Sequence, residues 1–189
     1  MTTDSVYTLN DGGNASEIER LNFNYRTFGV DITGKLLPEV IKNHLLSLKR
    51  PPAVADIATG TGIFLQDLAE ILPRDSRLDG FDFDTSKFME ASQLPSNVKL
   101  MFGNAFKDFP DELHGQYDCV HVRLLVYALK ADQWDLVVGN LKKLLRPGGW
   151  IFWDDIGYPS WTCLPMIDSF AKWLKIETRY AISVGRDVT

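Results

Sequence analysis

The sequence predicts a single doubly wound α/β domain, a parallel sheet with helices on both faces, behind an N-terminal helical cap. Short apolar strand-like runs alternate with amphipathic helical segments between residues 53 and 154, an order that right-handed βαβ units produce. The first run leads into a glycine turn, Thr59-Gly60-Thr61-Gly62. Polar residues follow the next two runs, where a Rossmann-like sheet binds its ligand. These three observations predict the fold class.

Length and composition agree with one globular domain. The chain has 189 residues, of which 45% are hydrophobic and 24% charged, as in ordinary folded proteins. The net charge is −5 and the basic residues are scattered, which disfavours nucleic acid as a partner. No apolar run is long enough for a bilayer span or resembles a secretory signal, and two cysteines make no disulfide framework. We expect a cytoplasmic protein without membrane, nucleic-acid or metal partners.

Residues 1–50 are expected to form the helical cap. Ser16-x-x-Glu19 has the form of a capping box, and apolar residues follow it at helical spacing until Gly29. Pro38 suits the first turn of a second helix. The expected apolar face of that helix consists of Val40, Ile41, Leu45 and Leu48.

Residues 51–159 are expected to form the α/β domain. The expected strands are 53–58, 77–82, 97–102, 117–122 and 150–154. Three helices are expected between these strands. The first ends at Pro73, the second is short and lies near residues 87–92, and the third runs from about residue 132 to residue 145. In the expected order the first strand is central and the fifth is outermost. Residues 160–189 are expected to add an amphipathic helix, roughly 164–182, that serves as a lid or an interface.

The glycine turn and the strand ends predict a nucleotide-like ligand. Gly60 and Gly62 follow the first strand, where we expect the backbone to approach the ligand closely. Asp82 ends the second strand, and its carboxylate can accept hydrogen bonds from both hydroxyls of a ribose. Asn104 and Ala105 follow the third strand, where an amide oxygen can accept from an adenine amine and a backbone N–H can donate to a ring nitrogen.

The nature of the nucleotide follows from two details. A dinucleotide fingerprint has a third glycine three residues after the second, and Leu65 stands there. Asp56 lies before the turn, where it would repel a pyrophosphate and suits the cationic methionyl end of S-adenosylmethionine. A phosphate-binding loop is excluded because no Gly-Lys-Ser/Thr follows. We therefore expect S-adenosylmethionine as the cofactor.

The motifs also resemble those of a known family. Val54-Ala-Asp-Ile-Ala-Thr-Gly-Thr-Gly-Ile63 is similar to the first motif of class I S-adenosylmethionine-dependent methyltransferases. The segments 78–82, 117–123 and 144–153 resemble, more specifically, the fungal secondary-metabolite methyltransferases. The resemblance implies cofactor contacts at Asp56, Ala58, Gly60, Gly62, Asp82, Phe83, Asn104 and Ala105.

The sequence departs from that family in four places. Ala58 replaces the usual first glycine, and Asn104 replaces a usual aspartate. Asn24-Tyr25 stands where the fungal family often has Gln-His, so a family acid/base histidine is missing. Family members usually continue past residue 189 with two antiparallel strands and substrate-binding segments, which we expect this chain to lack.

Candidates for chemistry and substrate binding are fewer. Catalytic candidates are His121, within the fourth strand, and Asp155, after the fifth; each also has a structural interpretation, as a core histidine and as a cap of the next segment. Candidate substrate contacts are Tyr25, Arg123 and Trp161. Methyl transfer is an in-line displacement at a sulfonium, so positioning can supply much of the acceleration.

Three functions remain open on the sequence. The first is methylation of a small, aromatic or polyketide-like acceptor at oxygen, nitrogen or carbon. The second is a non-catalytic or partner-dependent subunit with the same fold, and the third is an isomerase or cyclase. The outermost strand, Trp150-Ile-Phe-Trp153, is apolar on both faces, a hazard for an exposed edge. We therefore expect a homo-oligomer or a second subunit to cover that edge.

Overall fold

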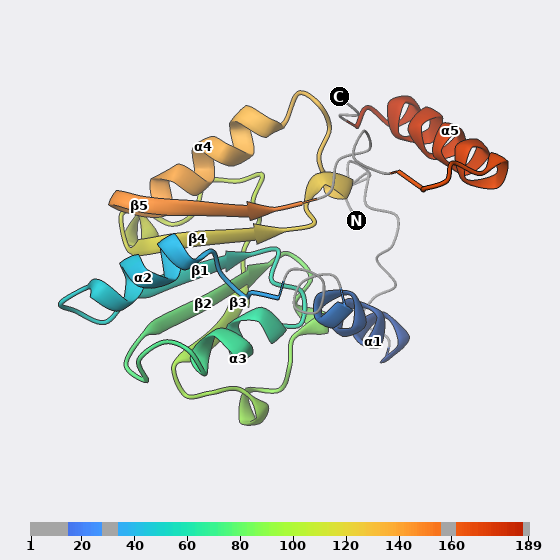
Figure 1. Cartoon of the computed structure of the whole chain (residues 1–189). Helices are drawn as coiled ribbons and strands as arrows, with labels where there is room; N and C mark the ends of the chain where they lie inside the picture. The colour runs from blue at the N-terminus through green and yellow to red at the C-terminus, as the bar shows by residue number, and fades with distance from the viewer. Residues whose placement is uncertain (1–14, 28–33, 156–161, 187–189) are drawn as a thin grey trace.

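The computed structural model describes residues 15–27, 34–155 and 162–186. Within them a five-stranded parallel sheet has the order β3-β2-β1-β4-β5 (Figure 1). The strands are β1 (Ala53–Ile57), β2 (Arg77–Asp82), β3 (Val98–Phe102), β4 (Tyr117–Arg123) and β5 (Leu145–Asp154). The helices are α1 (Ala15–Asn24), α2 (Glu39–Ser47), α3 (Ile63–Ala69), α4 (Trp134–Leu144) and α5 (Asp168–Ser183). The doubly wound prediction is confirmed, with the first strand central and the fifth outermost.

Helices cover both faces of the sheet because alternate residues of the strands point to opposite sides. On one face Ala55 and Ile57 of β1 pack with Val137 and Leu141 of α4 in one buried cluster. On the other face Val54 of β1 packs with apolar residues of α2 and α3 in a second cluster. All five residues of β1 are buried. The central strand is thereby held rigidly where it leads into the glycine turn.

Ion pairs tie the sheet together near the amino ends of its strands. Asp118, at the start of β4, is 3% exposed and accepts hydrogen bonds from Arg50, Arg146 and the Ala53 N–H. Burial acts to raise the pKa of the Asp118 carboxyl, but these donors and the two guanidinium charges outweigh it and hold the pKa below its ordinary value. This cluster anchors β1 to β4 at the end of the sheet opposite the strand ends that carry the polar residues.

The fifth strand is longer than predicted, and helices of the same chain contact both of its faces. It begins at Leu145 rather than residue 150, and its register against β4 shifts between Leu145 and Trp150, a stretch that contains Gly148 (φ +82°). Trp153 packs against Trp134 of α4, and Trp150 meets the His44 ring of α2. The chain's own helices therefore cover much of both faces of β5. Its outer edge has no partner strand among the described residues.

Smaller differences concern the helices. Val40 is exposed, although the spacing places it on the apolar face of α2. The expected helix near residues 87–92 is instead two short 3₁₀ turns, Thr85–Lys87 and Ala91–Gln93. Helix α5 lies beyond the carboxyl end of β5, away from the sheet (Figure 1). None of the described helices is long and apolar enough to cross a membrane.

Candidate functional site

A cavity of about 450 Å³ lies at the carboxyl ends of the strands, with walls from α1 and from the segments that follow β1 to β4. The strand order reverses at β1, between β2 and β4, which is the switch point where such sheets bind ligands. Seven of the eight predicted cofactor residues line this one cavity: Asp56, Ala58, Gly60, Asp82, Phe83, Asn104 and Ala105. The topology therefore brings together residues that are spread over about fifty positions of the chain.

Gly62 is the eighth predicted cofactor residue. It does not line the cavity, and it begins α3 with a left-handed backbone (φ +87°). A Cβ atom there would lie 2.7 Å from Leu100 Cδ1 of β3. The left-handed backbone at the start of α3 favours a glycine at position 62, and its close approach to Leu100 adds a packing reason beside the predicted contact with the cofactor.

Gly60 lies directly beside the cavity. Its φ is +59°, and a Cβ atom would meet only Leu21 Cδ1 at 3.8 Å, so the space beside it is the cavity. Ala58, in place of the family's usual glycine, has φ +57°, a conformation that costs an alanine about 1 kcal/mol more than a glycine. The turn thus keeps the left-handed backbone that a glycine would adopt more easily.

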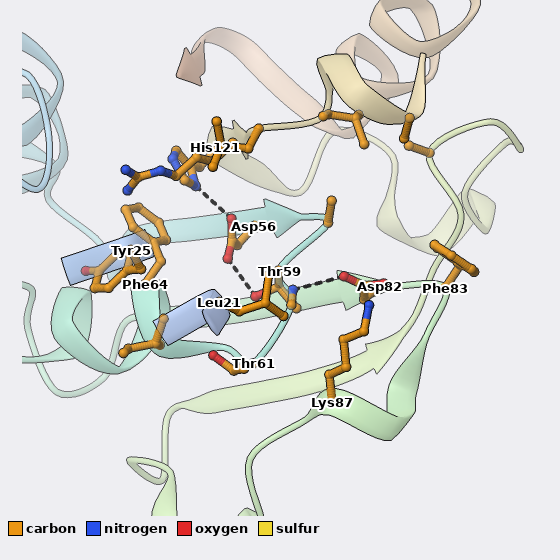
Figure 2. A pocket seen from close by; sticks show the side chains of 18 of the residues that line it. Leu21, Tyr25, Asp56, Thr59, Thr61, Phe64, Asp82, Phe83, Lys87 and His121 are labelled. Atoms are coloured by element: carbon orange, nitrogen blue, oxygen red, sulfur yellow. Dashed lines mark hydrogen bonds and ion pairs between the residues drawn. The ribbon is translucent and has the colours of Figure 1, made fainter. Parts of the chain in front are cut away.

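Asp82 places a carboxylate, already oriented by two hydrogen bonds, at one end of the cavity. Its Oδ2 accepts from the Gly60 N–H at 2.9 Å, and its Oδ1 accepts from the Asp84 N–H at 3.0 Å (Figure 2). Burial raises the pKa of this carboxyl, and the two N–H donors and the Lys87 charge act against that rise. Each oxygen retains a lone pair for a further donor, as a vicinal diol would supply.

Phe83, Asn104 and Ala105 form the adjoining part of the wall. The Phe83 side chain is 49% exposed and extends beyond Asp82 at one end of the cavity (Figure 2). Asn104 Oδ1 accepts from the Phe106 N–H at 2.9 Å, so one of its lone pairs is already used. Ala105 is held by a hydrogen bond from Asn140 Nδ2 to its carbonyl oxygen. An exposed ring beside fixed backbone suits a flat heterocycle.

Asp56 is held on both oxygens at the other end of the cavity. Thr59 Oγ1 donates to its Oδ2 at 2.6 Å, and His121 Nδ1 donates to its Oδ1 at 2.7 Å. The His121 ring stacks on Phe64 of α3 at 3.8 Å between centroids and is 2% exposed. His121 lines the cavity, and its hydrogen bond to Asp56 and its stacking on Phe64 make it a residue that positions Asp56 (Figure 2).

Tyr25 and Arg123 also line this end. The Tyr25 hydroxyl donates to Asp67 Oδ2 at 2.9 Å, and burial, followed by the Asp67 charge, raises the pKa of that phenol. Its hydroxyl is therefore a poor acid/base at neutral pH, and its ring is what faces Arg123, at 5.5 Å from the guanidinium carbon. Arg123 ends β4, and its Nε lies 3.6 Å from Asp154 Oδ2.

Asp155 and Trp161 are the two predicted residues that remain. Asp155 does not line the cavity; its Oδ2 accepts from the Val126 N–H at 2.8 Å and from Trp153 Nε1 at 3.0 Å. These bonds cap the 3₁₀ turn Val126–Ala128, which favours the structural interpretation over catalysis. Trp161 lies outside the described residues.

Sequence reasoning missed several residues of the wall. Arg20 and Leu21 enter from α1, Tyr127 comes from the 3₁₀ turn after β4, and Lys87 lies beside Asp82 with its Nζ 3.4 Å from Asp84 Oδ2. The Asp84-x-x-Lys87 spacing after β2 is a local signal that could have indicated Lys87. The contribution of α1 has no such signal, because the contact is made across distant segments.

Comparisons with known proteins agree with this geometry. A family model described as a methyltransferase domain matches residues 19–180. The chain is 38% identical over 171 residues to the methyltransferase grgD of a Penicillium species, covering 84% of this chain and 55% of grgD. It is 32% identical over 138 residues to the N-methyltransferase tcpN of Claviceps purpurea, covering 72% and 47% respectively. The chain thus spans about half the length of the curated relatives it matches.

A solved structure shows the same fold. The plantazolicin methyltransferase BpumL, in complex with a pentazolic desmethylPZN analogue and SAH, superposes with a TM-score of 0.58 at 20% identity. The match covers 78% of this chain and 56% of that chain. Together with the family match over residues 19–180 and the identity to grgD, these findings show that the chain belongs to the methyltransferase domain family.

Proposed function

We propose that this domain binds S-adenosylmethionine and transfers its methyl group to a small-molecule, secondary-metabolite acceptor. The observation that carries the proposal is the convergence of Gly60, Asp82 and Asp56 on one cavity at the switch point. The donor set fits the cofactor, because one carboxylate faces the place of a ribose and a second, Asp56, is an anion suited to an ammonium. The family match and the names of grgD and tcpN support the same reaction class.

The residues then have separate tasks. The cofactor supplies an electrophilic methyl group on a sulfonium sulfur. Asp82 would accept from the ribose hydroxyls, Phe83 would cover the base, and Asp56 would receive the ammonium through the lone pairs that His121 and Thr59 leave. Leu21 of α1 and Tyr25, directly after α1, line the cavity, so the cap of residues 1–50 would exclude water from it. Exclusion of water strengthens each of these polar contacts.

The partner-dependent subunit remains the second candidate. The observation that favours it is apolar surface: Leu164, Ile176 and Ile182, in and before α5, are more than half exposed. We propose that residues 160–189 form an interface, with a second copy or another subunit, in a cytoplasmic setting. No observation favours an isomerase or cyclase.

Calorimetry with S-adenosylhomocysteine, S-adenosylmethionine, NAD and ATP tests the function. We expect a Kd in the micromolar range, on the order of −8 kcal/mol, for the two adenosyl ligands, and much weaker binding of NAD and ATP. Tight NAD binding with no heat from either adenosyl ligand would overturn the proposal. Binding of the adenosyl ligands without turnover of any acceptor would favour the subunit.

A further inference from the structure

We propose that Arg123 forms an oxyanion subsite, and that the acceptor methylated in this cavity presents a carboxylate, enolate or phenolate oxygen to it. This inference rests on the proposed function. Three cationic side chains line the cavity: Arg20, Lys87 and Arg123. Arg20 is paired with Glu17 through two hydrogen bonds of 2.7 Å, and Lys87 lies beside Asp84 and Asp82. Of these three cations, Arg123 has the positive charge that neighbouring carboxylates neutralise least, so it is the one most available to an anionic ligand.

The surroundings of Arg123 leave its donors available. Its side chain is 15% exposed, and its ion pair with Asp154 is long, 3.6 Å between Nε and Oδ2, with an Asp154 side chain that is 35% exposed. Within residues 15–27, 34–155 and 162–186, the guanidinium otherwise interacts with the face of the Tyr25 ring, whose centroid lies 5.5 Å from its central carbon. A guanidinium has five N–H donors in a fork that matches a carboxylate. A largely buried cation with unused donors is stabilised by an incoming anion.

The backbone after Arg123 supports a binding role. Leu124 has φ +51°, one of two non-glycine residues with positive φ in the described chain, and the other is Ala58 in the cofactor turn. Both line the cavity. Such a conformation is strained for a residue with a Cβ atom, and it turns the chain directly after Arg123 into the wall formed by Leu125 and Tyr127. An apolar wall beside a guanidinium suits a flat, conjugated anion.

An oxyanion acceptor also needs no base, so transfer to it does not depend on proton uptake by the cavity wall. The Tyr25 phenol, bonded to Asp67 with a raised pKa, and His121, whose Nδ1 donates to Asp56, then need only hold their places. Transfer to an ionised oxygen balances without a base: its lone pair forms the O–CH₃ bond, the electrons of the broken C–S bond remain on sulfur, and no proton leaves. The product is neutral, so Arg123 loses its partner after transfer and release is favoured.

The same guanidinium chemistry would also suit the α-carboxylate of the cofactor, and binding measurements separate the two sources. S-adenosylhomocysteine carries that carboxylate, whereas 5′-methylthioadenosine lacks it. We expect Arg123→Met to change the Kd of both ligands by less than threefold. A loss of tenfold or more for S-adenosylhomocysteine alone would assign Arg123 to the cofactor and overturn the acceptor proposal. Failure of the unmutated protein to bind S-adenosylhomocysteine would instead contradict the proposed function.

The acceptor side is measured on protein saturated with S-adenosylhomocysteine, with 2-naphthoate and the neutral, similarly shaped 2-naphthamide as probes. We expect naphthoate to bind at least tenfold more tightly than naphthamide, with an affinity that falls as salt is added. Arg123→Met should remove this preference, and Arg123→Lys should retain part of it. Arg74→Met, an exposed site outside the cavity, makes the same charge change and should leave the preference intact. Equal binding of the two probes to the unmutated protein, or an equal loss in both methionine variants, would overturn the subsite.

Discussion

At the residue scale, the site depends on two buried carboxylates that are already oriented by hydrogen bonds and can still accept further ones. Asp82 is 7% exposed and already accepts two backbone N–H bonds, so its orientation is set before any ligand arrives. Asp56 is oriented in the same way by Thr59 and His121. Prior orientation reduces the entropy lost on binding, and it makes both residues sharp targets for substitution.

Asp82→Asn should weaken S-adenosylhomocysteine binding by roughly 1.5–3 kcal/mol, because it removes a charged acceptor for the ribose hydroxyls. Since burial raises the pKa of Asp82, the affinity of the unmutated protein should fall as the pH drops through that raised pKa, where the carboxylate becomes protonated. The variant should lack this fall. Calorimetry over a pH series measures both effects. Asp84→Asn, outside the cavity lining, is the control, and an equal loss in the two variants would contradict the assignment.

Two substitutions of His121 test the role of its Nδ1 hydrogen bond to Asp56. An asparagine places an N–H near the position of Nδ1, so His121→Asn should keep Asp56 oriented, whereas His121→Leu should weaken S-adenosylhomocysteine binding about tenfold, or ~1.4 kcal/mol. Binding of 5′-methylthioadenosine, which lacks the ammonium, should be unchanged in both variants. A loss of affinity for both ligands would show general damage to the cavity rather than a role in positioning Asp56.

At the element scale, the strands are joined by buried charges near their amino ends, far from the site. Asp118 connects β4 to the chain before β1 through Arg50 and the Ala53 N–H, and Arg77 and Asp79 of β2 meet Tyr117 of β4. Burial, followed by the Asp79 charge, raises the pKa of the Tyr117 phenol, so it remains a neutral donor to Asp79. These contacts hold β1, β2 and β4 in register, and register decides which side chains meet at the carboxyl ends.

Asp118→Asn should lower the free energy of unfolding at pH 7 by about 2 kcal/mol, the size of a charge-assisted hydrogen bond. The folded pKa of Asp118 is depressed, so its contribution is present above the unfolded pKa and is lost as the pH falls through the folded value. The difference between the variant and the unmutated protein should therefore shrink in acid. Urea titrations at neutral and acidic pH measure it. A difference independent of pH would contradict the ion-pair account.

At the scale of the whole molecule, apolar side chains are well buried on the sheet but largely exposed on α5. The sheet has two buried clusters, one on each face. Helix α5 has one buried residue, Ala181, and its end is attached through Arg186, which stacks on Tyr127 of the cavity wall. Exposed apolar patches commonly mark interaction surfaces, and we propose this role for the apolar face of α5.

We expect the purified chain to associate through α5 and the outer edge of β5. Light scattering at tens of micromolar should give a mass above the 21.4 kDa of one chain, because association buries the apolar face. Ile176→Glu, at a side chain 66% exposed, should shift the population toward the monomer, whereas Glu177→Gln should not. A stable monomer under these conditions that methylates an acceptor unaided would contradict both the interface and the partner-dependent candidate.

The sequence alone determined the order of strands, the glycine turn, and the polar residues at the strand ends, because period-two and helical patterns are local and parallel strands end at one edge. The tertiary structure decided which partners those residues meet. Gly62 packs closely against Leu100 of β3, Asp155 accepts from the first N–H of a 3₁₀ turn, and His121 orients Asp56. These contacts join residues 29 to 65 positions apart in the sequence. The pairing of His121 with Asp56 also depends on the register between β4 and β1. Local patterns carry no information on such pairings, and the packed sheet alone selects them.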